Sequence, residues 1–198
     1  LGPNGAGKTT LIKILTTLLA PSSGWARVVG HDVSQSPHKI RPRINMVSGG
    51  ESSGYGLLTV RENLWMFSQF YGLDSTEANQ RIKQLLEIVG ISDRINTKSS
   101  DLSTGLRQKM NIVRGFLTDP EVLFLDEPTL GLDAQSRIDL WQFVKRMNTD
   151  LGVTVFLTTH YLDEADRLCD RIGIFRTRLV TVDSPAQLRR ALYARQPV

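Results

Sequence analysis

The first ten residues constrain the fold of this chain more than any other segment. Residues 2–9 read Gly-Pro-Asn-Gly-Ala-Gly-Lys-Thr and fit the pattern G-x-x-x-x-G-K-[ST], and apolar residues at helical spacing follow from Leu11 to Leu19. In such a loop the glycines let backbone N–H groups face phosphate oxygens, the lysine adds a cation, and the hydroxyl ligates Mg²⁺. The start of the next helix also favours an anion. A Gly-rich turn without a ligand is the alternative, and the apolar helix directly after the loop argues against it.

A phosphate-binding loop of this kind normally follows a buried β-strand. Leu1 is the first residue of the sequence, so no residue that could form this strand precedes the loop. We therefore expect the chain to be an N-terminally truncated fragment.

Length and composition are those of one soluble globular domain with a sizeable core. The 24 Lys and Arg residues only slightly outnumber the 20 Asp and Glu residues, and no basic run is long enough for a nucleic-acid tail, so no nucleic-acid partner is expected. No apolar stretch approaches the roughly 20 residues that a membrane span needs. The one cysteine, Cys169, excludes an internal disulfide and is expected to be a small buried apolar side chain.

Strand-like and helical patterns alternate along the rest of the chain. Short apolar, β-rich runs predict strands at residues 25–29, 43–47, 121–125, 153–158, 172–175 and 179–182. Apolar residues at helical spacing predict helices at 60–71, 77–89, 106–116 and 135–147 and from Pro185 onwards. The predicted fold class is α/β, with a mostly parallel sheet, an all-helical segment at residues 57–118 and a small β element near the N-terminus.

An apolar strand that ends in two carboxylates is the second strong signal. The run Val122 to Leu125 leads directly into Asp126 and Glu127. In a phosphate-loop protein, a carboxylate at the C-terminal end of a neighbouring strand holds Mg²⁺, and a second one orients the attacking water. We assign the first role to Asp126 and the second to Glu127. A solvated acidic turn is the alternative, but the phosphate loop independently requires such a partner.

A second helix start also has the features of an anion site. Ser103 and Gly105 stand where the helical run 106–116 begins, so that a hydroxyl, backbone amides and the helix dipole could face an anion. An ordinary helix cap is the alternative for Ser103. An ordinary helix cap is also the alternative for Asp133, where capping and function can coexist. For His160 the alternative is a capping or core role.

Together these motifs resemble the nucleotide-binding subunit of ABC transporters over essentially the whole chain. Residues 2–9 match the family's Walker A motif, and residues 122–127 match its Walker B motif with the catalytic glutamate. Residues 102–108, Leu-Ser-Thr-Gly-Leu-Arg-Gln, are similar to its signature, residues 131–133 to its D-loop, and His160 to its switch histidine. The Ser-Thr-Gly signature and residues 163–170 look most like the ATPases of drug, polysaccharide and cation exporters, including the daunorubicin-resistance type.

The resemblance implies a P-loop NTPase that hydrolyses ATP with Mg²⁺ and sandwiches two ATP in a dimer with a second ATPase subunit. It also implies a transmembrane permease partner and a peripheral location at the cytoplasmic face of the cell membrane. Within one domain, residues 1–48 and 119–198 would form the core, and residues 49–118 the Q-loop region with the helical subdomain. The implied catalytic residues are Lys8, Glu127 and His160, and the implied metal ligands are Thr9 and Asp126. The implied nucleotide contacts are Gly2, Pro3, Asn4, Gly5, Ala6, Gly7, Lys8, Thr9, Thr10, Ser103, Gly105 and Asp133.

The chain departs from the family pattern in several places. Gly49 stands where the family's Q-loop glutamine contacts Mg²⁺ and the attacking water, and Thr104 and Leu106 replace two signature residues. We interpret the signature changes as a character of the exporter branch. The family's adenine-stacking aromatic residue would lie upstream of Leu1. Its sheet also places an upstream strand between the strands predicted at 153–158 and 172–175.

Two other classes of function stay open. One is a soluble ABC-type ATPase that acts on nucleic acid or the ribosome, against which the single cassette without a basic arm argues. The other is a non-hydrolysing nucleotide-binding module that regulates a partner, which Gly49 favours and Glu127 and His160 oppose.

Aromatic residues gather around the loop at residues 48–56 and in the helix that follows it. Leu64, Phe67 and Tyr71 share a helical face and are expected in the core. One amphipathic helix cannot bury every aromatic residue in this region. We therefore expect at least one of Tyr55, Trp65 and Phe70 to be exposed in an apolar docking patch, to which the resemblance assigns the permease.

Overall fold

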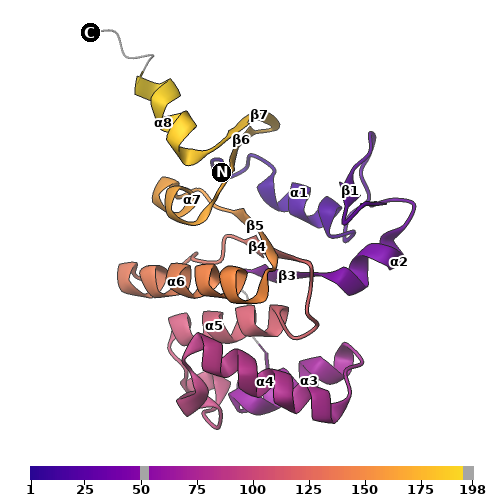
Figure 1. Ribbon diagram of the computed structural model, residues 1–198, viewed down its shortest axis with the longest axis vertical. Coiled ribbons are helices and arrows are strands. Elements are labelled where there is room, and N and C mark those ends of the chain that lie inside the picture. Colours follow the sequence, from indigo (N-terminus) through magenta and orange to yellow (C-terminus); the bar gives the residue numbers. More distant parts are fainter. Residues whose placement is uncertain (50–53, 194–198) are drawn as a thin grey trace.

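A parallel sheet of three strands lies at the centre of the molecule (Figure 1). The computed structural model describes residues 1–49 and 54–193 of the chain. The strands stand in the order β3 (Ile44–Ser48), β4 (Val122–Asp126) and β5 (Thr154–Thr158). In the central strand Leu123 and Leu125 belong to one apolar cluster and Phe124 to another, and all three are buried. Both faces of the sheet are therefore covered, which explains the continuous apolar run of β4.

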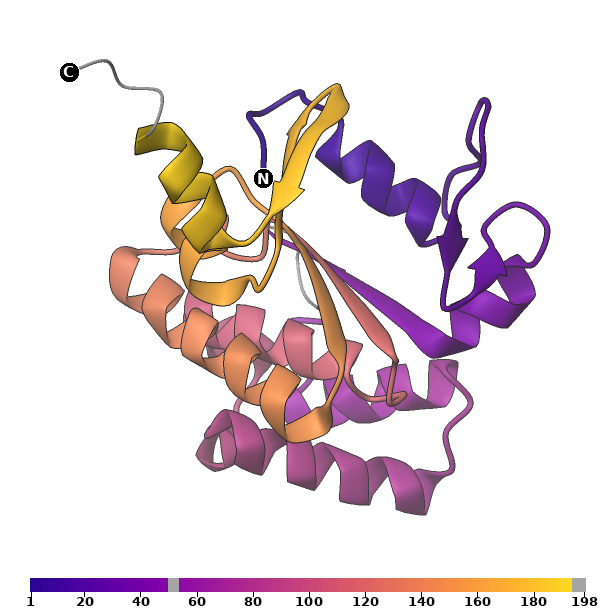
Figure 2. The ribbon, with the colours of Figure 1, turned by 45° about the horizontal axis from the view of Figure 1, so that its top comes forward.

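Helices lie on both sides of the sheet (Figure 2). One side carries α1 (Lys8–Leu15), β1 (Arg27–Val28), β2 (His31–Asp32), α2 (Pro37–Ile40) and the 3₁₀ turn η1 (Arg41–Arg43). The other side carries α5 (Thr104–Gly115) and α6 (Ala134–Leu151), with α3 (Val60–Phe70), α4 (Ser75–Val89) and the 3₁₀ turns η2 (Ser92–Arg94) and η3 (Ser99–Asp101) beyond them. This arrangement confirms the predicted α/β class, the small β element and the all-helical segment. The division of the domain at residues 48 and 118 stays a prediction.

Capping side chains determine where several helices begin. At α3, Thr59 forms a capping box with Glu62, because each side chain accepts a hydrogen bond from the backbone N–H of the other residue. At α4, the Asp74 carboxylate accepts hydrogen bonds from the N–H groups of the first turn. The helix therefore begins at Ser75, two residues before the predicted start. α6 continues past the predicted residue 147, because its C-terminal stop is Gly152, which adopts a left-handed conformation.

A second sheet of two antiparallel strands, β6 (Ile172–Arg176) and β7 (Arg178–Asp183), stands apart from β5. Leu1 lies in the interval between β5 and β6. Its amino group donates to the Gly173 carbonyl at 2.8 Å, and its carbonyl accepts from the Phe175 N–H at 2.8 Å. A cavity of about 810 Å³ beside it is lined by residues of β5, β6, β7 and α1. This is the interval in which the resemblance places an upstream strand, and that strand stays a prediction.

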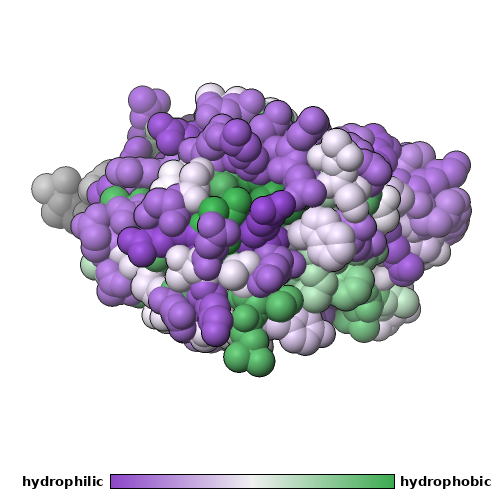
Figure 3. All heavy atoms as spheres, turned by 90° about the horizontal axis from the view of Figure 1, so that it is seen from below, coloured by the Kyte–Doolittle hydropathy of each residue, from purple (hydrophilic) through white to green (hydrophobic). Residues whose placement is uncertain are grey.

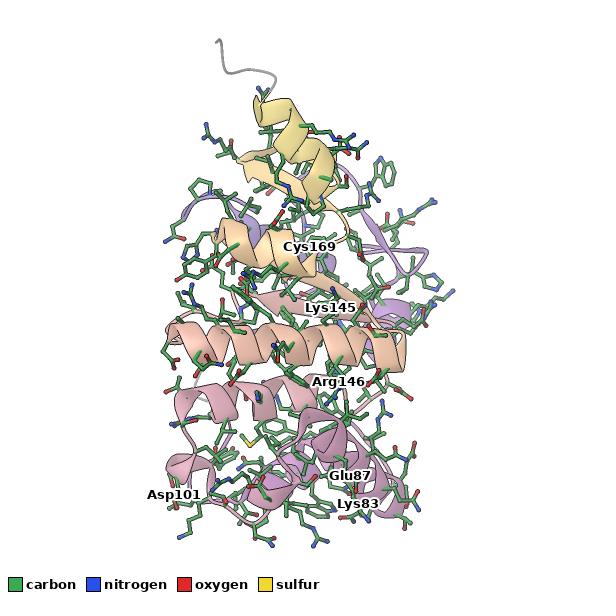
Figure 4. The ribbon with its side chains drawn as sticks, turned by 60° about the vertical axis from the view of Figure 1, so that its left-hand side comes forward. Lys83, Glu87, Asp101, Lys145, Arg146 and Cys169 are labelled. Carbon is green, nitrogen blue, oxygen red and sulfur yellow. The ribbon has the colours of Figure 1, made fainter. Side chains whose placement is uncertain are left out.

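The remaining helices, α7 (Leu162–Leu168) and α8 (Pro185–Tyr193), follow β5 and β7. Two adjacent residues of α6 point to opposite sides: Lys145 lines the cavity, whereas Arg146 donates to the Ile88 carbonyl at 3.2 Å and so ties α6 to the end of α4 (Figure 4). No helix in residues 1–49 and 54–193 is long and apolar enough to span a membrane.

Two burial predictions are wrong. Cys169 follows the last residue of α7 and is only half-buried, because it lines the cavity instead of packing inside a helix. Tyr71 lies just after α3 and is exposed, although it shares a helical face with the buried Leu64. The prediction of exposed aromatic residues is confirmed, because Tyr55, Trp65 and Phe70 are 61%, 41% and 70% exposed.

Candidate functional site

The phosphate-binding loop runs from the edge of β6 into α1. Gly5 and Gly7 adopt positive φ angles of 77° and 96°, which residues with a Cβ rarely adopt. Gly7 stands at the N-cap of α1 and provides no side-chain cap, and the first turn contains no acidic residue. The first backbone N–H groups of α1 therefore have no side-chain acceptor at the cap position and are suited to bind an anion.

The hairpin of β6 and β7 fixes the position of this loop. The Thr177 N–H donates to the Ala6 carbonyl at 3.1 Å, and the Gly2 N–H donates to the Thr159 carbonyl at 3.2 Å. A Cβ at Gly2 would lie only 2.2 Å from the Phe175 carbonyl oxygen, so the backbone approaches β6 more closely than any side chain would allow. Gly2, the first glycine of the motif, therefore allows the loop to pack closely on β6. This is in addition to the phosphate contact that the sequence predicts.

Lys8 is the buried cation of the site, with 6% of its surface exposed. Its Nζ donates to the carbonyls of Gly2 at 2.8 Å and Pro3 at 3.0 Å, inside its own loop. The same Nζ lies 3.0 Å from Oε1 of Glu127. The loop lysine and the carboxylate after β4 are therefore in direct contact, although 118 residues separate them in the sequence.

Glu127 is held from several directions. Its N–H donates to the Thr158 carbonyl at 3.0 Å, and its φ angle is 49°, in the left-handed region. Its Oε2 lies 3.1 Å from Nδ1 of His160, so the imidazole donates when Nδ1 carries the proton. One carboxylate thus bridges Lys8 and His160, and three residues predicted as catalytic lie together.

Asp126 is buried at the end of β4, and its carboxylate accepts a hydrogen bond from the Thr158 hydroxyl. Thr9 is exposed in the first turn of α1. Among the described residues, no three His, Cys, Asp or Glu side chains are grouped as a metal cage. Mg²⁺ does not need one, because it binds through one or two protein oxygens together with substrate phosphates and water. The oxygen donors of Thr9 and Asp126 fit that requirement.

The other predicted contacts form a separate, exposed surface at the starts of α5 and α6. The Ser103 hydroxyl accepts from the Leu106 N–H at 3.3 Å, and the Asp133 carboxylate accepts from Ser136 through its N–H at 2.9 Å and its hydroxyl at 2.6 Å. A Cβ at Gly105 would lie 2.9 Å from the Ser136 hydroxyl, so the two helix starts adjoin. The hydroxyl and the N–H of Ser136 lower the pKa of Asp133.

Sequence reasoning missed several residues of the site. Thr158 contacts both Asp126 and Glu127, and its position in the last residue of β5, beside Asp126, was the available signal. Tyr161 stacks against His160 with ring centroids 4.0 Å apart, and the guanidinium of Arg137 lies 4.9 Å from the Tyr161 ring. No sequence pattern marked these two residues, because their contacts join α6 to the segment after β5.

The family model of the ABC transporter matches residues 1–130. The chain is 42% identical over 193 residues to the daunorubicin/doxorubicin resistance ATP-binding protein DrrA of Streptomyces peucetius, across 97% of this chain and 58% of that protein. It is 39% identical over 190 residues to the probable multidrug ABC transporter ATP-binding protein YbhF of Escherichia coli strain K12, across 96% of this chain and 32% of that protein.

Among solved structures, CbiO1 from Clostridium perfringens, part of the ABC transporter complex CbiONQ, superposes with a TM-score of 0.86 and 26% identity, across 100% of this chain and 82% of that one. The match to the family model covers most of the chain and includes the phosphate-binding loop, β4 and Glu127. The chain spans 58% or less of the length of the two curated relatives described above. On these grounds, this chain belongs to the ABC transporter family.

Proposed function

We propose that this chain is the ATP-hydrolysing part of an exporter-type ABC transporter. The observation that carries the proposal is the contact of Glu127 with both Lys8 and His160 beside an uncapped helix start. A carboxylate that can orient water and a cation that can stabilise phosphoryl charge suit phosphoryl transfer to water, and the imidazole adds a further hydrogen-bonding group. The names of the relatives, which include drug-resistance and multidrug transport ATP-binding proteins, support ATP as the nucleotide and export as the process.

Each residue has a role that follows from its contacts. Lys8 would exchange its contacts with the Gly2 and Pro3 carbonyls and with the Glu127 carboxylate for phosphate oxygens. Glu127 is then free to orient or deprotonate water. His160 donates to the γ-phosphate, and since a neutral imidazole has one N–H, this bond replaces the one to Glu127. Thr9 and Asp126 would hold Mg²⁺, which neutralises phosphate charge when bound. The amides at the start of α1 stabilise the charge that develops on the transferred phosphoryl group.

A second ATPase subunit completes the site in this proposal. Ser103, Gly105 and Asp133 form an exposed surface of two adjoining helix starts, and their polar contacts lie within those starts. Such a surface suits a nucleotide held by the phosphate-binding loop of the partner. The dimer would sandwich two ATP, with residues 49–118 acting as the helical subdomain of each subunit.

The permease partner would bind at the end of the molecule formed by α3 and α4, at the cytoplasmic face of the membrane. In Figure 3, which looks at this end, apolar groups interrupt a mostly hydrophilic surface. The exposed apolar side chains of this region include Tyr55, Leu57, Trp65 and Phe70, which we call the docking patch, and Tyr71 lies beside them after α3. The buried amide of Asn63 holds part of it, because its Oδ1 accepts from the Tyr55 N–H at 2.8 Å and its Nδ2 donates to the Tyr55 carbonyl at 3.1 Å.

The alternatives have less support. A nucleic-acid-binding ATPase would need a basic surface, and the net charge of +4 is spread along the sequence. A regulatory module that does not hydrolyse ATP would have no use for a glutamate held between a lysine and a histidine. Salt-dependent binding of RNA or DNA by the full-length protein would favour the first alternative, and ATP binding without turnover would favour the second.

The hydrolysis test uses the full-length protein with its permease and compares Glu127→Gln with Glu121→Gln. Both residues flank β4, but Glu121 is exposed and pairs with Arg43, away from the site. Glu127→Gln should retain ATP and lose nearly all turnover, whereas Glu121→Gln should hydrolyse ATP at the parental rate. Turnover near the parental rate in Glu127→Gln would show that the assignment of Glu127 is wrong.

The docking test replaces Tyr55, Trp65 and Phe70 by Ser and measures co-purification with the permease and basal ATP hydrolysis separately. Trp25→Ser is the matched control, because Trp25 is also an exposed aromatic residue, with 79% of its surface accessible, and lies by the β1–β2 hairpin. Loss of permease binding with intact hydrolysis supports the proposal. Loss of both, together with a lower unfolding temperature, would show that the replaced side chains serve folding only.

A further inference from the structure

The backbone of Gly49 lies against the carbonyl group of Glu127. Gly49 directly follows β3, and its N–H donates to the Asp126 carbonyl at 2.7 Å. A Cβ at Gly49 would lie 1.8 Å from the Glu127 carbonyl oxygen, 2.8 Å from the Glu127 carbonyl carbon and 3.3 Å from Cα of Pro128. Protein Cβ atoms essentially never approach another heavy atom within 3.0 Å. All three neighbours are backbone atoms, so no flexible side chain can move away.

The Glu127 backbone cannot move freely away from such a Cβ either. On its other side, its N–H is bonded to the Thr158 carbonyl at 3.0 Å. The next residue is Pro128, whose ring fixes its φ angle. The Glu127 φ angle of 49° is in the left-handed region, and the Glu127 carbonyl oxygen lies beside Gly49. A displacement of this peptide would also move the carboxylate that contacts Lys8 at 3.0 Å and His160 at 3.1 Å.

We propose that Gly49 is a positioning residue for Glu127. The absence of a side chain at residue 49 allows the end of β3 to hold the Glu127 peptide in the conformation that places its carboxylate between Lys8 and His160. The inference rests on the proposed function, because it assigns a catalytic consequence to the position of Glu127. It also gives a structural reason why this chain has glycine, and not the glutamine of the family, at this place.

The expected effect is large because the clash is large. To accept any Cβ, the distance to the Glu127 carbonyl oxygen must grow from 1.8 Å to at least 3.0 Å, so backbone atoms must move by more than 1 Å. A misplacement of about 1 Å at a catalytic group costs on the order of 100-fold in rate. Gly49→Gln should therefore lower turnover as Gly49→Ala does, instead of restoring the missing glutamine contact.

The experiment measures kcat, KM and MgATP affinity of the full-length protein with Gly49→Ala and Gly49→Gln, with Gly56→Ala as the control. Gly56 has a negative or extended φ, and its Cβ would meet only the Ser100 Cβ at 3.6 Å, which is an ordinary contact. Both Gly49 variants should lose roughly 100-fold in kcat, with KM and MgATP affinity nearly unchanged, and Gly56→Ala should match the parent. A kcat within twofold of the parent in either Gly49 variant would overturn the proposal.

A double variant identifies the residue through which Gly49 acts. When Gly49→Ala is added to Glu127→Gln, the residual single-turnover rate should not fall further, because both changes disable the same carboxylate. An additional 100-fold loss would show that Gly49 acts elsewhere and would overturn the inference. Glu127→Gln alone tests the proposed function, so the two failures are distinguishable.

A measurement on the parent protein covers the case in which the Gly49 variants do not fold. The Glu127 amide, bonded to Thr158 and held by Gly49, should exchange its hydrogen slowly in the native state, at a rate near that of the β4 amides. Exchange as fast as that of an exposed loop amide would mean that the peptide is not held, and the proposal would be wrong.

Discussion

The N-termini of α1 and α5 are both proposed to face phosphate, yet they differ in whether a side chain caps their first backbone N–H groups. At α1 the N-cap is Gly7, without a capping side chain, and the first residue is the buried Lys8. At α5 the exposed Ser103 hydroxyl caps the first turn through the Leu106 N–H. The α1 start is enclosed by residues from after β4 and from the β6–β7 hairpin, whereas the exposed α5 start adjoins that of α6.

From this difference we infer which helix start can bind phosphate within a single chain. An uncapped start leaves amide donors for a ligand, whereas a start capped by its own side chain is already stable without one. We infer that the nucleotide affinity of a single chain depends on the α1 start. In the proposed dimer, the α5 start would contribute when it meets the phosphate-binding loop of a second subunit.

Lys8→Ala should have the largest effect on this comparison. It removes the buried cation at the α1 start, and hydrogen bonds to charged groups contribute about 1.5–3 kcal/mol, so MgATP affinity should fall about 10- to 100-fold. Lys13→Ala is the control, because Lys13 is an exposed cation in the last turn of the same helix. Equilibrium binding of MgATP to the full-length protein measures both, and parental affinity in Lys8→Ala would refute the assignment.

Tyr161→Ala should have the next largest effect, because Tyr161 links the nucleotide site beside α1 to the start of α6, which adjoins that of α5. Its ring packs on His160, and the guanidinium of Arg137, in the first turn of α6, lies 4.9 Å from the Tyr161 ring. An aromatic contact of this kind contributes about 0.5–1.5 kcal/mol, so turnover should fall roughly threefold to tenfold at unchanged MgATP affinity. Tyr161→Phe keeps the ring and should keep the rate. Equal losses in both variants would assign the effect to the hydroxyl.

Ser103→Ala should affect stability more than binding by a single chain. Loss of a serine N-cap costs about 1 kcal/mol of unfolding free energy, which denaturant unfolding measures. MgATP affinity of the dilute, monomeric protein should stay at the parental value, and Ser103→Asn should recover the stability, since asparagine also caps. A clear loss of monomer affinity in Ser103→Ala would break the distinction between the two helix starts.

The features that the sequence predicted depend on residues close together in the chain. The phosphate-binding loop and the strand that ends in Asp126 and Glu127 are each complete within eight residues. Their conformation follows from glycine freedom and apolar periodicity, which short segments determine by themselves. For this reason the fold class and most elements were predictable.

The features that it missed depend on contacts between distant segments. Lys8 contacts Glu127, Gly49 lies against the same residue, and Arg137 packs on Tyr161, and none of these pairs shares a local pattern. Gly49 is instructive, since the alignment with the family shows only a missing glutamine, whereas the structure shows a close backbone contact that requires glycine. Packing between elements, and not propensity, determines such contacts.

The smallest expected effect concerns the pH dependence of the α6 start, which is capped like that of α5. The hydroxyl and N–H of Ser136 hold the pKa of Asp133 below its usual value of 3.8. A carboxyl group with a lower pKa in the folded state stabilises the protein above its unfolded-state pKa, and this stabilisation is lost as pH falls through the folded-state pKa. Acid unfolding of the parent should therefore include a small contribution from Asp133 below pH 3.8 that Asp133→Asn lacks. Denaturant unfolding at pH 3 and pH 6 measures the difference, and identical pH dependence in the parent and Asp133→Asn would show that this cap contributes nothing to stability.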